Sequence, residues 1–166
     1  VAREELMALV YRRVRSIANQ SLMKHAQATL TPTELAHEAL IRLLGTNAGW
    51  VDRRHFFHVV AQATRQVIVD HARRRLSDKR GQGVEALPLS QAPEVPGGGF
   101  DDDVVRVDEA IVALAQEDSR QAQIVELSYF GGFSREEIGE ALEVSVATVD
   151  RDLRFARAWL KEALSP

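Results

Sequence analysis

Three arginines spaced three residues apart are the side chains best suited to chemistry in this sequence. Arg151, Arg154 and Arg157 lie in the stretch EVSVATVDRDLRFAR, residues 143–157 of 166, and Lys161 continues the series. On a helix this spacing produces a single cationic stripe. Guanidinium groups donate paired hydrogen bonds to phosphate oxygens or to the edge of a guanine base. The stripe therefore indicates contact with nucleic acid, unless it is a solvated face whose arginines pair locally with aspartates.

The residues around the stripe predict a helix-turn-helix. Ser134 and Glu137 form a capping box that starts a short helix, and Ser145 can cap the next helix. Gly139 is small where two such helices approach closely. Glu143 counts against the motif, because a residue other than glycine in a left-handed turn costs about 1 kcal/mol. In such motifs the second helix enters the major groove. The expected DNA contacts are Ser145, Ala147, Thr148, Asp150, Arg151, Arg154 and Arg157.

A second cationic segment lies in the first half of the chain, where residues 1–80 hold 14 Lys and Arg against 7 Asp and Glu. Phe56 and Phe57 lie in the same helical pattern as Arg65, Arg73, Arg74 and Arg75. The charges of Arg65, Arg73 and Arg74 have no evident partner beyond Asp70 and Asp78. Cations beside aromatic rings suit single-stranded nucleic acid, because phosphates are neutralised and bases stack. A core helix with a basic C-terminal end, which complements the helix dipole, explains the pattern equally well.

Hydrophobic periodicity predicts helices almost throughout, and no strand stands out. Residues 81–103 lack that period and are rich in proline and glycine, as in a flexible linker. We therefore predict an all-α fold with two small helical domains, residues 1–80 and 104–166, of which the second contains the helix-turn-helix. In the first domain we expect a helix over residues 3–27, a second from Pro32 to about Gly45 that starts with a Thr31–Glu34 capping box, and a long third helix that starts at Asp52. In the second domain we expect a helix from about Val104, another over residues 119–130 that ends at Gly131-Gly132, and then the two helices of the motif.

Several functional classes are excluded. The sequence has no cysteine, so it forms no disulfide, thiolate metal site or cysteine nucleophile, and a reducing cytoplasm is the expected location. No apolar run is long enough for a transmembrane helix. His55 and His58 could share a helical face, but neither an H-E-x-x-H motif nor a glycine-rich phosphate loop is present. We expect no enzymatic activity, metal or cofactor.

Three segments, in this order, resemble the sigma-70 family of bacterial RNA polymerase initiation factors, and most of all its short extracytoplasmic-function (ECF) type. ELAHEALIRLL (34–44) is similar to region 2.2, with matches at Leu35, Glu38, Arg42 and Leu43 and with His37 in place of glutamine. ATRQVIVDHARRR (63–75) resembles regions 2.3–2.4, with matches at Arg65, Asp70, Arg73, Arg74 and Arg75 and with Gln66 in place of asparagine. Residues 133–157 are similar to region 4.2, with Glu143 at the turn glycine.

The resemblance implies a promoter-specific initiation factor. Leu35, Glu38, Arg42 and Leu43 would bind core polymerase, while Arg65, Arg73, Arg74 and Arg75 would hold the melted minus-ten element. The C-terminal motif would read the minus-thirty-five element as duplex. Asp101, Asp102 and Asp103 would mimic the charge of the transcript in a linker near the RNA path, or form a plain acidic linker. An anti-sigma factor is a further candidate partner. The alternative is a helix-turn-helix regulator of duplex DNA without a core-polymerase role.

Overall fold

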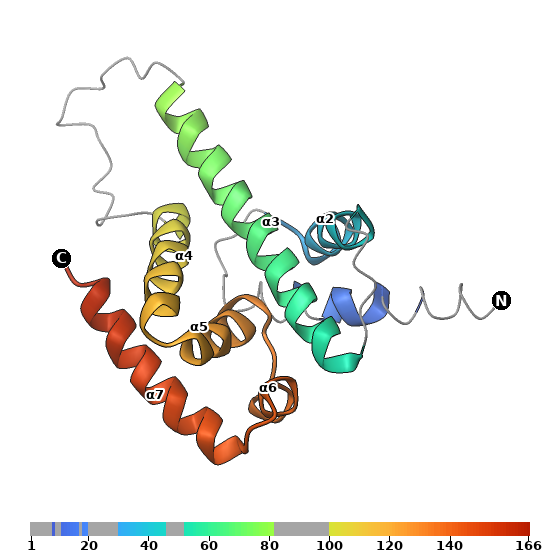
Figure 1. Cartoon of the computed structure of the whole chain (residues 1–166). Helices are drawn as coiled ribbons and strands as arrows, with labels where there is room; N and C mark the ends of the chain where they lie inside the picture. Colours follow the sequence, from blue (N-terminus) through green and yellow to red (C-terminus); the bar gives the residue numbers. More distant parts are fainter. Residues whose placement is uncertain (1–7, 9–10, 17, 20–29, 46–51, 82–99) are drawn as a thin grey trace.

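The computed structural model describes residues 8, 11–16, 18–19, 30–45, 52–81 and 100–166. Within these ranges the regular structure is entirely helical, which confirms the expected all-α fold. The labelled elements are α2 (Pro32–Gly45), α3 (Arg53–Gly81), α4 (Phe100–Glu117), α5 (Ser119–Val125), a π-helical turn η1 (Glu126–Phe130), α6 (Arg135–Leu142) and α7 (Val146–Ala163). The long helix α3 runs through the middle of the molecule, with α2 on one side and α4 to α7 on the other (Figure 1). In the described ranges no helix is long and apolar enough to cross a bilayer.

The first two labelled helices start where their capping residues predict. The Thr31 hydroxyl accepts from the Glu34 backbone N–H at 3.2 Å, and the Glu34 carboxylate accepts from the Thr31 N–H at 2.9 Å. Pro32 takes the first helical position, where its missing N–H costs nothing. Asp52 accepts from the His55 N–H at 2.8 Å, and this hydrogen bond lowers the pKa of the Asp52 carboxyl. Both capping predictions are confirmed.

The segment expected to be a linker contains the start of a helix. Residues 82–99 lie outside the described part, but α4 already begins at Phe100, earlier than the expected Val104. Asp101, Asp102 and Asp103 form its first turn, where carboxylates complement the positive end of the helix dipole. The helix therefore begins four residues before the expected Val104, and the assignment of residues 81–103 to a linker stays a prediction.

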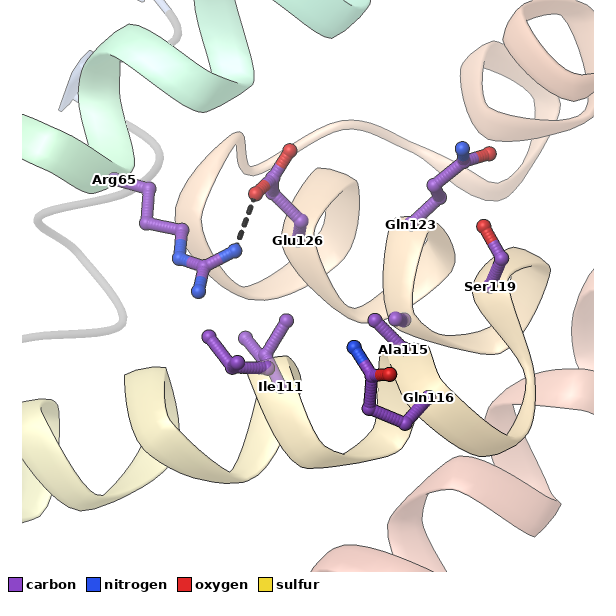
Figure 2. A pocket seen from close by; sticks show the side chains of 9 residues that line it. Arg65, Ile111, Ala115, Gln116, Ser119, Gln123 and Glu126 are labelled. Carbon is purple, nitrogen blue, oxygen red and sulfur yellow. Dashed lines mark hydrogen bonds and ion pairs between the residues drawn. The ribbon is translucent and has the colours of Figure 1, made fainter.

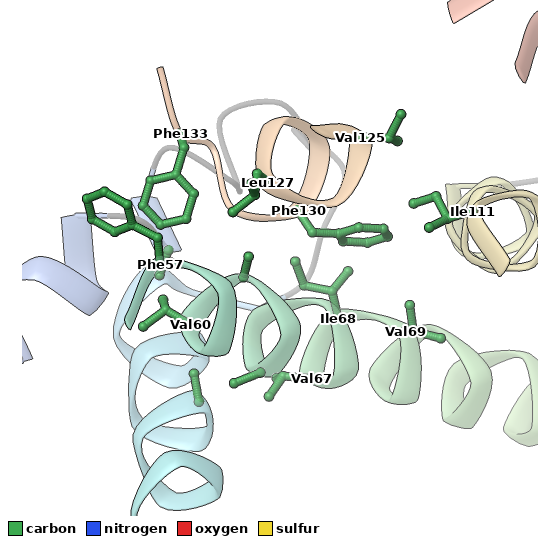
Figure 3. Packing of buried hydrophobic residues seen from close by; sticks show 14 of the residues in the cluster. Phe57, Val60, Val67, Ile68, Val69, Ile111, Val125, Leu127, Phe130 and Phe133 are labelled. Carbon is green, nitrogen blue, oxygen red and sulfur yellow. The ribbon is translucent and has the colours of Figure 1, made fainter. Parts of the chain in front are cut away.

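One hydrophobic core extends across both predicted domains. Ile68 and Val69 of α3 face Phe130 of η1, and Ile111 of α4 packs beside them (Figure 3). Nearer the start of α3, the ring centroids of Phe57 and Phe133 lie 4.8 Å apart. The domain boundaries stay predictions, but in this arrangement α3 is part of the packing on both sides. The core side chains that are almost fully buried include Leu35, Val60, Val67, Val104, Leu114, Ile124, Leu127 and Ile138.

A π-helical turn joins α5 to the loop before the motif. The Gly131 N–H donates to the Glu126 carbonyl at 3.0 Å, which makes this turn one residue wider than an α-helical turn. The chain leaves the turn at Gly131 and Gly132, and Gly132 has a φ of 64°, so the predicted end of this helix is confirmed. Burial, assisted by the charge of Asp103, raises the pKa of Tyr129 to about 12.

Candidate nucleic-acid and polymerase interfaces

Residues 134–163 form the predicted helix-turn-helix. The Ser134 hydroxyl accepts from the Glu137 N–H at 3.1 Å in a complete capping box, and the Ser145 hydroxyl accepts from the Thr148 N–H at 3.1 Å. A Cβ atom on Gly139 would lie 2.8 Å from the Val144 carbonyl oxygen. This separation is too short for any side chain, so the expected close approach at Gly139 is confirmed.

The turn between α6 and α7 is closed by Glu143 in the left-handed conformation, with φ 56° and ψ 42°. The Val144 N–H then donates to the Gly139 carbonyl at 3.0 Å and satisfies the end of α6. The Glu143 carboxylate forms an ion pair with Arg54 of α3. Glu143 counted against the motif in the sequence, but it does occupy the left-handed position of the turn. Its carboxylate is paired with an arginine of another helix.

The arginine stripe lies on the surface of α7. Arg151, Arg154 and Arg157 are exposed, whereas Val149 and Leu153 are buried on the opposite side of the helix. The aspartates in the same segment do not neutralise the whole stripe. Asp152 points inward and accepts from Arg120 of α5 at 2.7 Å, with Arg151 3.7 Å away, and Asp150 pairs with Arg135 of α6 at 2.9 Å. In the described ranges no carboxylate lies within 4.0 Å of Arg154 or Arg157, which favours an external anion.

The other predicted DNA contacts occupy the first turns of α7. Ser145 and Ala147 are exposed, and Thr148 and Asp150 are half-buried. Motif matching missed Phe155, whose side chain is 61% exposed one turn beyond Arg151. The sequence does indicate that Phe155 is exposed. The buried residues of α7 recur at Val149, Leu153 and Ala156, and Phe155 does not share that period.

The arginines of α3 are positioned differently from the sequence-based expectation. We expected no partner for them beyond Asp70 and Asp78, and this was wrong. Arg65 donates to Asp108 of α4 at 2.6 Å and to Glu126 of η1 at 2.6 Å, as Figure 2 shows for Glu126. Burial by itself lowers the pKa of Arg65, but the hydrogen bonds to Glu126 and Asp108 outweigh it and raise that pKa above its ordinary value.

The two arginines near the C-terminal end of α3 also contact α4. Arg73 donates to Asp108 at 3.2 Å, and Arg75 donates to the buried Asp101 at 3.0 Å. Arg74 is exposed. Of the four arginines predicted to hold melted DNA, three are thus in ion pairs with α4 or η1 in this structure.

Two clefts adjoin Arg65. One, of about 230 Å³, is lined by Ile111, Ala115 and Gln116 of α4 and by Ser119, Gln123 and Glu126 (Figure 2). The other, of about 310 Å³, lies between α3 and the acids that pair with it, and includes Gln62, Gln66 and Asp70. In the described ranges no group of three or more His, Asp or Glu residues is arranged to hold a metal ion.

A family model for ECF sigma factors matches residues 1–166. The chain belongs to the ECF sigma factor family. It is therefore a promoter-specific transcription initiation factor whose partners are RNA polymerase core enzyme and promoter DNA, and sigma factors as a family are not enzymes. No curated protein and no solved structure matches the chain. The family supports this role over the alternative of a regulator without a core-polymerase function.

The expected polymerase-binding residues of this sigma factor lie on α2, but two of the four are in the core. Leu35 and Leu43 are buried against the rest of the protein, so in this structure they stabilise the fold and offer no surface to a partner. Glu38 is half-buried, and Arg42 pairs with Asp70 of α3 at 2.8 Å. The exposed apolar residues of the helix are Ile41 and Leu44, at 69% and 59% exposure. The motif comparison missed both, although Ile41 falls outside the period of Leu35, Ala39 and Leu43.

Proposed function

We propose that three helices of this sigma factor carry its three contacts. The exposed surface of α2 binds core polymerase, α3 holds the melted minus-ten strand, and α7 reads the minus-thirty-five element as duplex. The observation that carries the proposal is the exposed arginine stripe on the second helix of a complete helix-turn-helix. A third partner, an anti-sigma factor, and a cytoplasmic location belong to the same proposal, and the absence of cysteine fits that location.

For the polymerase contact we propose Glu38 and Arg42 together with Ile41 and Leu44. An exposed apolar pair flanked by charges has the composition of a small interface patch. The proposed function is tested by co-purification of the tagged factor with core polymerase, followed by run-off transcription. The factor should elute with the core and support promoter-dependent transcripts. A factor that binds DNA without retaining core polymerase would contradict the proposal.

Placing a charge on this α2 patch should weaken core binding. Ile41→Asp introduces a carboxylate where an apolar side chain would be desolvated by the polymerase, and it costs little stability because Ile41 is exposed. We expect about a tenfold or larger loss in affinity, measured by titration of core enzyme. Val112→Asp is the matched control, since Val112 is also an exposed apolar residue but lies on α4. Equal affinities for the two variants would place the interface elsewhere.

Removing the cationic end of α3 should impair strand opening. With Arg73→Ala and Arg74→Ala combined, core binding and duplex recognition should stay intact, whereas the open complex should weaken, and more so at higher salt. Permanganate footprinting of unpaired thymines, with holoenzyme on a cognate promoter, measures the opening.

Arg151→Ala provides the reciprocal control. Loss of the Arg151 guanidinium should reduce recognition of the upstream duplex by about 1–3 kcal/mol at one base pair. It should leave the contact with the unpaired minus-ten strand of an artificially melted promoter unchanged. If both variants opened promoters as the wild type does across the salt series, the contacts proposed for α3 and α7 would be refuted.

A further inference from the structure

Phe155 is an exposed aromatic side chain on α7, the second helix of the helix-turn-helix. Its side chain is 61% exposed, whereas the other phenylalanines whose exposure the structure describes are buried or half-buried. A phenylalanine that contributes to a core removes most of its apolar surface from water. Phe155 does not, so the fold itself gives no reason for an aromatic residue at this position.

The next aromatic residue of α7 shows what a structural role looks like. Trp159, one turn further along, packs against the core, and its indole N–H donates to the Glu117 carboxylate of α4 at 2.9 Å. Within the described part of the chain, Phe155 takes part in no aromatic pair and no cation–π contact. Its ring therefore does not hold α7 in place and is available to a partner.

The surroundings of Phe155 indicate what that partner is. Ala147, Arg151 and Phe155 are four residues apart, so they lie in one row along α7, and all three are exposed. Arg154 beside this row is also exposed. Two guanidinium groups around an exposed ring suit a polyanion with apolar groups between its charges. Duplex DNA has this character in its major groove, where each thymine presents a C5-methyl group between the two phosphate backbones.

We propose that Phe155 is a specificity-determining residue of α7, whose ring packs against the C5-methyl group of a thymine in the upstream duplex. The inference rests on the role proposed for α7 in reading that duplex. Phenylalanine is among the side chains that read a thymine methyl by apolar contact. Four residues of helix rise by about 6 Å, which is close to two base-pair steps of 3.4 Å. The thymine therefore lies within about two base pairs of the pair that Arg151 contacts.

The test removes the methyl group from the DNA and the ring from the protein, separately and together. Each thymine of the upstream element, on both strands, is replaced in turn by deoxyuridine, which keeps the pairing with adenine and lacks only the methyl group. Holoenzyme containing the wild type, Phe155→Ala or Val112→Ala then binds each duplex in competition with the unmodified promoter. Val112→Ala is the matched control, because it shortens an exposed apolar side chain on α4, outside the helix-turn-helix. Circular dichroism checks that each variant is folded.

The wild type and Val112→Ala should lose about fourfold in affinity at one thymine, the value of burying one methyl-sized group. Phe155→Ala should bind the thymine and the deoxyuridine promoters equally well at that position. Its affinity for core enzyme alone should match that of the wild type. The dependence of its promoter binding on salt should also be unchanged, since the ring carries no charge, whereas Arg154→Ala should lower the salt slope by about one.

Two results would overturn the methyl contact. The first is the absence of a sensitive thymine, or the same loss at that thymine in the wild type and in Phe155→Ala. The second is weaker binding of Phe155→Ala to core enzyme alone, which would assign the ring to a protein surface. Arg151→Ala reports separately whether α7 reads the duplex. A loss in that variant without any effect of the methyl group would refute the role of Phe155 and leave the proposed function of α7 in place.

Discussion

Replacing Phe130 with alanine should lower the free energy of unfolding by about 3–5 kcal/mol, the usual cost of removing a large aromatic side chain from a core. Phe130 is fully buried in η1 where this turn meets α3 and α4. Its ring also contacts Tyr129 edge-on, with centroids 4.8 Å apart. The cavity would open at the centre of the contact between the two halves of the chain (Figure 3). Urea unfolding followed by circular dichroism measures the change.

Phe155→Ala is the matched control, because the same side chain is removed from an exposed position on α7. Its unfolding free energy should stay within about 0.5 kcal/mol of the wild type. If Phe130→Ala were as stable as Phe155→Ala, the contact between η1 and α3 would not contribute to the stability of the free factor.

Gly139→Ala should destabilise the factor by about 2 kcal/mol and reduce recognition of the upstream duplex. The new Cβ would lie 2.8 Å from the Val144 carbonyl oxygen, a backbone atom of the turn that cannot rotate away as a side chain can. The turn must therefore shift, and α7 shifts with it relative to α6. Thermal unfolding reports the stability, and promoter binding by the holoenzyme reports the displaced helix.

Gly45→Ala tests whether the loss comes from the close approach or from glycine as such. Gly45 ends α2, and a Cβ there would meet no atom within 4 Å. Since alanine is the better helix former, this variant should be as stable as the wild type or slightly more so. A comparable loss at both positions would mean that the contact at Gly139 is not the cause.

Local signals in the sequence predicted the helix starts and the helix-turn-helix well. Thr31, Asp52, Ser134 and Ser145 cap their helices through hydrogen bonds to residues three positions away, so the entire interaction is contained in a few consecutive residues. The arginine stripe of α7 could be predicted equally well, because helical spacing alone places its side chains on one face. The family resemblance then connected these segments into one protein.

The partners of the α3 arginines could not be predicted in this way. Arg65 pairs with Asp108 and Glu126, which are 43 and 61 residues away in the sequence. Such pairs depend on how distant helices pack, and the hydrophobic period of one helix does not specify its neighbour. The same limit applies to α2, where a family motif gave Leu35 and Leu43 as contacts although their own periodicity places them in the core. The π-helical turn has no comparable local signal.

The position of α3 between two packing layers also determines how the protein loses its structure. It contacts α2 on one side and α4 and η1 on the other, so neither layer can melt without leaving one face of α3 in water (Figure 1). Partly unfolded forms are then rare, and heat should unfold the described helices in a single cooperative transition. Proteases that cut within the described helices would consequently act on the globally unfolded chain, so the rate of cleavage at these sites would follow the global stability of the factor.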